Sequence, residues 1–282
     1  MQQLAYVPFA TIKGIRIHYI ESGEGNPLVL QSHDSRTWLF QQAYFSEFYR
    51  VISFDRRGTG HSANPPGPWT VKHFSNDMIG LLDELKIEKT IVAGHSLGGK
   101  IAQWFALDHP DRLKGLILSC TNIFSDKQLA AWYKETLAGL KRGEPAAKFL
   151  AKDSNPPFET KSLPNTNPEF AKSTIGRFLL EEVLRDVTGR GSGAIKSMYA
   201  ASKSDLRPRL SEYKKIKCPT LVLAAGSESQ ENIIQGYELS KIIPHAEFRV
   251  LSNVYHGVTR EDPGLWCRVV KSFLKRHGLW PK

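Results

Sequence analysis

Residues 94–99, Gly-His-Ser-Leu-Gly-Gly, constrain the fold of this chain more than any other part of it. Residues 90–93 are β-branched and apolar, as in a buried strand, and the apolar residues of 100–107 recur at helical spacing. A strand that runs directly into a helix bends sharply at Ser96, and the flanking glycines leave room for that bend. The Ser96 hydroxyl is therefore predicted to project at a helix N-terminus, where backbone N–H groups favour developing negative charge. In the alternative interpretation, the serine only caps the helix.

Apolar runs and helical patterns alternate along most of the chain. The runs typical of strands are residues 10–13, 15–20, 27–31, 50–54, 90–93, 113–119, 219–224 and 248–251. Helical spacing is found at residues 71–85, 97–109, 233–243 and 265–276. This alternation predicts an α/β fold with a mostly parallel sheet flanked by helices.

Residues 125–210 interrupt the alternation. They contain several helical patterns, such as the apolar spacing of 178–184, and breaks rich in proline and asparagine at 155–157 and 164–168. No convincing strand is found there. We interpret the segment as a helical insertion into a core formed by residues 1–124 and 211–282.

Composition narrows the classes of partner. Lysine and arginine exceed aspartate and glutamate by 38 to 28, a net charge of +10, which fits a solvated basic surface or an anionic small-molecule substrate. The sequence lacks the basic stripe with interleaved aromatic residues that is typical of nucleic-acid binding, so we do not expect a nucleic-acid partner. No apolar run reaches the roughly 20 residues that cross a bilayer, and the N-terminus lacks a signal-peptide pattern. The cysteines, Cys120, Cys218 and Cys267, lack CxxC spacing and indicate reduced thiols in the cytoplasm. Oligomeric state is left open.

His256 is the predicted base for Ser96, because a serine hydroxyl needs one to become a nucleophile. It follows the last predicted strand, where the C-terminal ends of a parallel sheet collect catalytic groups. The alternative is a loop histidine that is hydrogen-bonded to backbone.

An oxyanion hole needs two backbone N–H groups directed at one point. The N–H of Leu97 is the first candidate, and the loop after residues 27–31 offers the second at His33 or Asp34. A carboxylate beside an oxyanion would oppose catalysis, so the Asp34 side chain is expected to turn away. Alternatively, His33 or Asp34 takes part directly, which would imply other chemistry than acyl transfer.

These patterns resemble the α/β-hydrolase superfamily over nearly the whole chain. The resemblance rests on residues 94–99, 55–62 and 109–113 and on His256 ahead of 261–263. Residues 65–70, Trp38 and 205–207 are similar to 3-oxoadipate enol-lactonases. The resemblance implies that Ser96 is the nucleophile and His256 the base, that Leu97 and the loop at 33–34 form the oxyanion hole, and that residues 125–210 are a helical cap.

The acid of the triad departs from the family pattern. The expected aspartate position holds Ser229, and residues 119–122 offer no carboxylate. Since losing the orienting carboxylate costs roughly 10⁴-fold in turnover, three alternatives stay open. Glu228 or, less favourably, Glu231 replaces the aspartate; a Ser–His dyad acts on an activated substrate; or the protein binds a ligand without catalysis.

The resulting prediction is a hydrolase of a small ester, lactone or related acyl compound that requires neither a metal nor an organic cofactor. The basic residues of the insertion point to a carboxylate-bearing substrate. The enzymatic alternative is a lyase, carbon–carbon bond hydrolase or cofactor-free oxygenase in which His256 takes a proton from the substrate. The other alternative is a non-catalytic pseudo-hydrolase.

Overall fold

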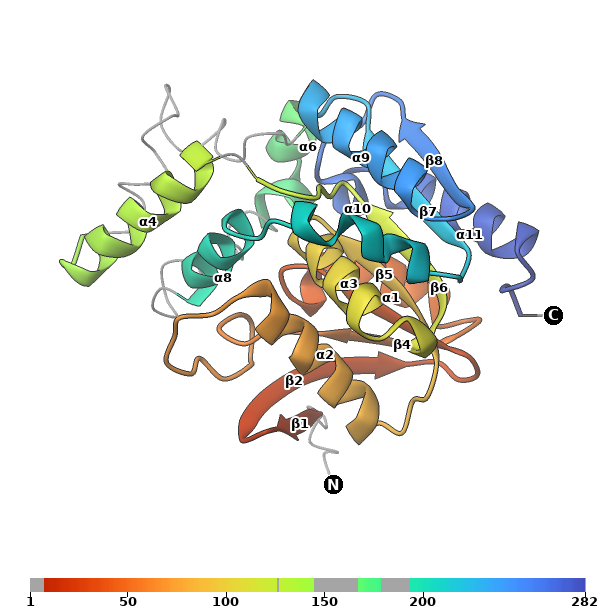
Figure 1. Ribbon diagram of the computed structural model, residues 1–282, viewed down its shortest axis with the longest axis horizontal. Helices are drawn as coiled ribbons and strands as arrows, with labels where there is room; N and C mark the ends of the chain where they lie inside the picture. The colour runs from red at the N-terminus through yellow and green to blue at the C-terminus, as the bar shows by residue number, and fades with distance from the viewer. Residues whose placement is uncertain (1–7, 126, 145–166, 179–192, 282) are drawn as a thin grey trace.

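The computed structural model describes residues 8–125, 127–144, 167–178 and 193–281. Within these residues, eight strands form one sheet in the order β1-β2-β4-β3-β5-β6-β7-β8 (Figure 1). The strands are β1 (Phe9–Ile12), β2 (Ile15–Ser22), β3 (Pro27–Gln31), β4 (Arg50–Phe54), β5 (Thr90–His95), β6 (Leu113–Ser119), β7 (Thr220–Ala225) and β8 (Ala246–Leu251). Only β1 with β2 and β2 with β4 pair antiparallel among them, and the other neighbours pair parallel. The predicted mostly parallel sheet is confirmed.

Helices cover both faces of the sheet, because alternate strand residues enter two separate cores. In β3, Val29 packs into one core, and Leu28 and Leu30 pack into the other. Three helices bury their apolar sides in the Val29 core: α2 (Val71–Glu84), α3 (Leu97–Asp108) and α9 (Gln230–Ile242). Two helices close the opposite core: α1 (Leu39–Phe45) and α11 (Pro263–Arg276).

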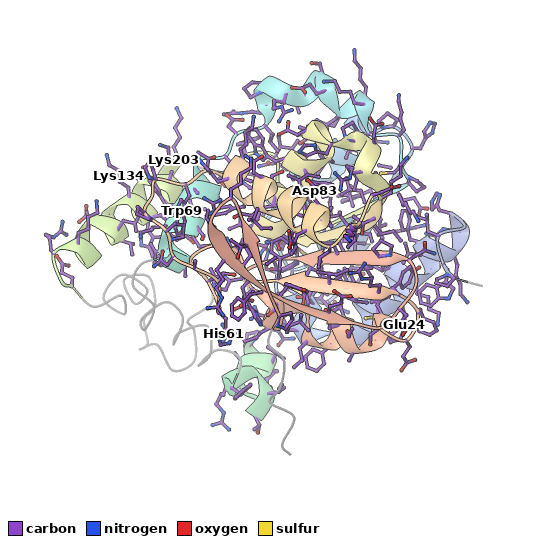
Figure 2. The ribbon with its side chains drawn as sticks, turned by 90° about the horizontal axis from the view of Figure 1, so that it is seen from below. Glu24, His61, Trp69, Asp83, Lys134 and Lys203 are labelled. Atoms are coloured by element: carbon purple, nitrogen blue, oxygen red, sulfur yellow. The ribbon has the colours of Figure 1, made fainter. Side chains whose placement is uncertain are left out.

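The described part of the segment between β6 and β7 is helical. Its elements are α4 (Lys127–Lys141), α6 (Pro168–Lys172), α8 (Gly193–Ser202) and the 3₁₀ helix η3 (Arg207–Lys215). Lys134 and Lys203 lie at one end of the molecule and Glu24 lies at the other (Figure 2). The breaks at 155–157 and 164–166 and most of the apolar spacing at 178–184 lie outside the described residues. The division into a core and a cap stays a prediction.

Two contacts join the ends of this segment to the sheet domain. Phe124 and Asp205 form an antiparallel bridge, so the chain leaves and returns at one place. The buried Lys100 of α3 donates from Nζ to Ser125 Oγ at 2.7 Å and to the Ala201 carbonyl at 3.2 Å. The end of α8 is therefore attached beside the first turn of α3.

Short elements were the ones that hydrophobic spacing did not predict. They include the 3₁₀ helices η1 (Ser35–Trp38) and η2 (Pro110–Arg112) and the single turn α10 (Val258–Glu261). Periodicity needs several turns to become visible, and these elements have one or two. None of the helices in the described ranges is long and apolar enough to cross a membrane.

Candidate active site

The bend between β5 and α3 holds Ser96 in a conformation that non-glycine residues rarely adopt, with φ 57° and ψ −121°. Close backbone contacts explain the glycines around it. A Cβ added to Gly94 would lie 2.4 Å from the Gly98 carbonyl oxygen, and one added to Gly98 would lie 1.9 Å from the Gln31 carbonyl oxygen. The predicted bend is present, and Ser96 stands at the N-terminus of α3.

His256 reaches Ser96 from the turn after β8. Its Nε2 lies 2.8 Å from Ser96 Oγ, and its Nδ1 is hydrogen-bonded to Glu228 Oε1. The Glu228 side chain is 1% exposed, whereas that of His256 is 31% exposed. Because an ionised carboxylate only accepts hydrogen bonds, Nδ1 carries the proton and the lone pair of Nε2 faces the serine hydroxyl. This arrangement lets His256 take a proton from Ser96.

Glu228 occupies the turn after β7, one residue before the position at which an aspartate was expected. Its second oxygen accepts a hydrogen bond from the Ala225 N–H at 3.2 Å. Ser229 instead caps α9 by accepting from the Asn232 N–H at 3.3 Å. The carboxylate that contacts His256 is that of Glu228, whereas the Glu231 carboxylate accepts from Gln235 Nε2 at 3.1 Å within α9.

The loop between β3 and η1 packs against the first turn of α3. A Cβ on Gly98 would lie 2.8 Å from Ser32 Cα, which shows how closely the two backbones approach. The Asp34 carboxylate accepts a hydrogen bond from the Thr37 N–H at 3.3 Å, which caps η1, and forms an ion pair with Arg36 at 2.5 Å. The N–H of Leu97, at the first helical position of α3, has no partner within its own helix.

His33 is held in place by Arg56, a residue that the sequence reading did not single out. Arg56 Nε donates to the His33 carbonyl at 3.0 Å, and Nη2 lies 2.9 Å from His33 Nδ1. The Thr59 hydroxyl donates to the same carbonyl at 2.9 Å. Burial, together with the charge of Arg56, lowers the pKa of His33 to about 4, so the ring is neutral near pH 7. These contacts engage His33 Nδ1 and the Asp34 carboxylate, while His33 Nε2 is buried without a hydrogen-bond partner.

Asp55 connects the same loop to the rest of the sheet. One carboxylate oxygen accepts from the Ser35 N–H and hydroxyl, both at 2.8 Å. The other accepts from the His61 N–H at 2.7 Å and contacts His18 Nδ1 at 2.8 Å. Burial raises the pKa of Asp55, but the hydrogen bonds from His18, Ser35 and His61 outweigh it and the pKa is lowered. The glycine-rich turn at 55–62 was the sequence signal for this network.

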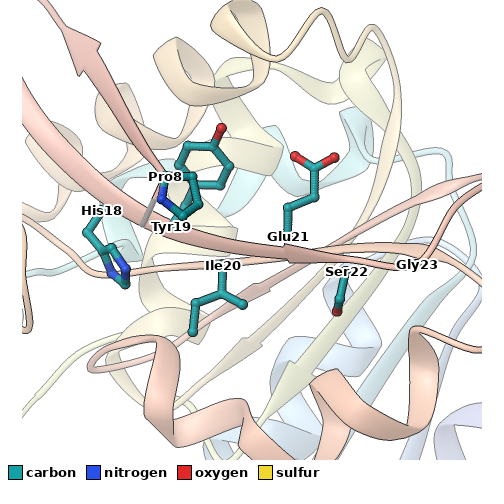
Figure 3. A pocket seen from close by; sticks show the side chains of 7 residues that line it. All are labelled: Pro8, His18, Tyr19, Ile20, Glu21, Ser22 and Gly23. Carbon is teal, nitrogen blue, oxygen red and sulfur yellow. The ribbon is translucent and has the colours of Figure 1, made fainter. Parts of the chain in front are cut away.

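The described residues also contain a cluster of possible metal ligands and a groove along one strand. Cys120, Glu228 and His256 are the three side chains in the described ranges that could share a metal ion, with ligand atoms all within 4.8 Å of one another. A separate groove runs along β2 (Figure 3), lined by Pro8, His18, Tyr19, Ile20, Glu21, Ser22 and Gly23. In the sheet, β4 and β3 lie between β2 and β5. The groove is therefore separate from the Ser96 cluster.

Comparisons with known proteins agree with this architecture. A family sequence model described as the alpha/beta hydrolase fold matches residues 25–263. The chain is 28% identical over 272 residues to 3-oxoadipate enol-lactonase 2 of Acinetobacter baylyi, covering 94% of this chain and 96% of that protein. A hydrolase structure from Pseudomonas aeruginosa aligns with a TM-score of 0.81 at 27% identity, over 96% and 99% of the two chains. The enol-lactonase structure from Burkholderia xenovorans aligns with a TM-score of 0.76 at 26% identity, over 95% and 100%.

Proposed function

Since the chain belongs to the α/β-hydrolase fold family, we propose that this hydrolase cleaves a small ester or lactone by a Ser–His–Glu mechanism. The observation that carries the proposal is the continuous contact from Ser96 Oγ through His256 to Glu228. A relative named as an enol-lactonase that matches along nearly the whole chain supports a lactone or ester as the substrate class.

In the proposed reaction, Ser96 Oγ attacks the carbonyl carbon while its proton passes to His256 Nε2. Glu228 stabilises the imidazolium that forms and keeps Nδ1 directed away from the serine. The N–H of Leu97 and an N–H of the loop at His33 and Asp34 hold the oxyanion. His256 then returns the proton to the leaving alcohol or enol oxygen. Water, deprotonated by His256, releases the acid from Ser96.

The two alternatives make different predictions for Ser96. In a lyase, carbon–carbon bond hydrolase or oxygenase that uses only His256 as base, the serine would be dispensable. In a non-catalytic ligand-binding protein, the serine would not be activated. The contacts of His33 and Asp34 with Arg56 and Arg36 do not favour a direct catalytic role for this pair, which was the feature that suggested other chemistry.

A fluorophosphonate probe tests the proposal directly. The unaltered protein should be labelled at Ser96, and Ser96→Ala should not be labelled and should lose roughly 10⁶-fold in turnover of a nitrophenyl ester or an enol-lactone. Retained turnover in Ser96→Ala would favour the His256-only chemistry. Failure of the unaltered protein to react with the probe would favour a non-catalytic role.

An anionic substrate is part of the proposal because of Arg260. The backbone N–H of this α10 residue donates to the Gly257 carbonyl at 2.8 Å. Its side chain forms no hydrogen bond within the described residues, and its Nε is buried without a partner. Its charge acts on His33 in the oxyanion loop and on His95 beside the nucleophile. The neighbouring Glu261 carboxylate already accepts from the Asn167 and Tyr255 N–H groups. Burial lowers the pKa of Arg260, and the charges of the Asp34 and Glu261 carboxylates act in the opposite direction. Because neither carboxylate is hydrogen-bonded to the guanidinium, we propose that Arg260 is available to a carboxylate of the substrate.

Substitution of Arg260 tests this part separately. Arg260→Gln should raise KM for a carboxylate-bearing ester by roughly 10- to 100-fold, the value of one charged hydrogen bond, and leave a neutral ester unchanged. The exposed Arg268 of α11 provides the control, since Arg268→Gln removes the same charge from a surface position. Equal effects of Arg260→Gln on both esters would contradict carboxylate recognition.

The cytoplasmic location drawn from the cysteine pattern stays a prediction.

A further inference from the structure

Cys120 lies beside the proposed acid and base. It follows β6 with φ 48°, and its N–H donates to the Leu223 carbonyl of β7 at 2.8 Å. Because β6 and β7 are parallel neighbours, their C-terminal ends bring Cys120 next to the turn that holds Glu228. The thiol is buried, and Cys120 Sγ, a Glu228 oxygen and a His256 ring nitrogen all lie within 4.8 Å of one another.

These three groups form a donor set suited to zinc. Zn²⁺ binds thiolate, imidazole and carboxylate at roughly 2.0–2.3 Å, and a site with three protein ligands leaves the fourth position to water. Tetrahedral bonds of that length place the ligand atoms about 3.5 Å apart, so small side-chain shifts suffice here. On binding, the Cys120 thiol releases its proton to solvent. One thiolate and one carboxylate then neutralise the charge of the ion.

We propose that Cys120, Glu228 and His256 form an inhibitory binding site for zinc or another thiophilic divalent cation. The ring nitrogen that faces Glu228 is Nδ1, so the ion binds Nδ1. A neutral imidazole with a metal on Nδ1 carries its proton on Nε2, the nitrogen that faces Ser96. Such an imidazole cannot accept the serine proton. The predicted inhibition rests on the proposed hydrolase function, whereas the binding itself does not.

The surroundings of the site define its selectivity and its access. The His256 side chain is 31% exposed, while Cys120 and Glu228 are buried, so the ion is proposed to enter by displacement of the His256 ring. Mg²⁺ and Ca²⁺ prefer full shells of oxygen ligands and should not bind a thiolate–imidazole pair. Zinc and cobalt should bind, and magnesium should have no effect at equal concentration.

The binding test uses Co²⁺ added to the full-length protein, because a cobalt–thiolate bond gives a charge-transfer absorption band. We expect one cobalt per chain with this band, displaced by Zn²⁺, and loss of the band in Cys120→Ala. Cys218→Ala and Cys267→Ala are the matched controls and should keep the band. Absence of the band in the unaltered protein, or its persistence in Cys120→Ala, would overturn the site.

The inhibition test measures hydrolysis at increasing Zn²⁺ concentrations. Because each ligand of a zinc site carries a substantial share of its affinity, Cys120→Ala should raise the half-inhibiting concentration roughly 100-fold. Chelation should restore activity. Equal zinc sensitivity of the unaltered enzyme and Cys120→Ala would contradict the three-ligand site. Cobalt binding through Cys120 in a protein without hydrolase activity would support the site and refute the proposed function. Circular dichroism of Cys120→Ala identifies a folding defect, and Cys120→Ser then serves as the second variant.

Discussion

Replacing Glu228 by glutamine is the sharpest test of the arrangement around His256. Glutamine has the shape of glutamate, and its carbonyl can still accept the hydrogen bond from the Ala225 N–H, so the turn after β7 should keep its conformation. The amide NH₂ group, however, can donate a hydrogen bond to His256 Nδ1, which an ionised carboxylate cannot. The Nδ1 lone pair would then face residue 228, and the proton would move to Nε2, facing Ser96.

That change of tautomer sets the size of the effect. In a serine triad, the equivalent change from carboxylate to amide lowers kcat roughly 10⁴-fold, or about 5 kcal/mol of barrier. KM should change little, because the carboxylate contacts His256 and not the substrate in the proposed reaction. Glu228→Asp should be nearly as inactive. Its carboxylate is one carbon–carbon bond shorter, about 1.5 Å, which takes it beyond hydrogen-bonding distance of Nδ1.

Steady-state kinetics on one ester, with fluorophosphonate labelling rates as a second measure, would test both variants. Glu231→Gln is the matched control, because Glu231 bonds Gln235 on α9 and should keep full activity. If Glu228→Gln retained more than about a tenth of the kcat of the unaltered enzyme, the requirement for a triad acid would be refuted and a Ser–His dyad favoured. If Glu231→Gln were the damaged variant, the assignment of Glu228 would fail.

Three further predictions concern stability. Asp77→Asn should lower the free energy of unfolding in urea by roughly 3–5 kcal/mol, because it leaves Arg57 buried without its carboxylate partner at 2.5–2.7 Å; a loss below 1 kcal/mol would contradict this. Gly98→Ala should unfold the protein or abolish probe labelling, since its Cβ would clash with the Gln31 carbonyl oxygen. A fully active variant would show that the loop after β3 can move to remove this clash. Burial lowers the pKa of Lys100 to about 7 despite the nearby Asp205. Above that pH the folded protein has lost the Lys100 proton, whereas the unfolded chain still binds it. Stability should therefore rise between pH 7 and 10 by up to roughly 1.4 kcal/mol per unit, and Lys100→Met should lack this rise.

The fold was predictable because its largest elements have strong patterns. The strands from β3 to β7 are short apolar runs buried on both faces, and α2, α3 and α11 carry helical spacing over three or more turns. The starts of α9 and α11 were predicted a few residues late. Capping side chains set these boundaries: Ser229 begins α9, and Asp262 begins α11 by accepting from the Leu265 N–H at 2.8 Å.

The proposed acid could not be chosen from the sequence, because the choice depends on the conformation of one turn. Ser229 stands where the family pattern places an aspartate, yet its side chain is committed to the N-cap of α9. Glu228 starts one residue earlier, and its additional methylene compensates for that offset. The sequence identified Glu228 and Glu231 as candidates, but it does not indicate in which direction each side chain points. Only the backbone of the turn after β7 distinguishes Glu228 from Glu231.

Sheet order explains why the proposed catalytic groups and the proposed zinc ligands share one place. The strands β5, β6, β7 and β8 are consecutive neighbours, and all four run parallel. Each is followed at its C-terminal end by one of the residues concerned, in the order Ser96, Cys120, Glu228 and His256. Neighbouring parallel strands lie about 4.8 Å apart, so the side chains that follow them are within reach of one another. The thiol of Cys120, which follows β6, therefore lies between Ser96 and Glu228. A cation bound to this thiol would also be within reach of His256.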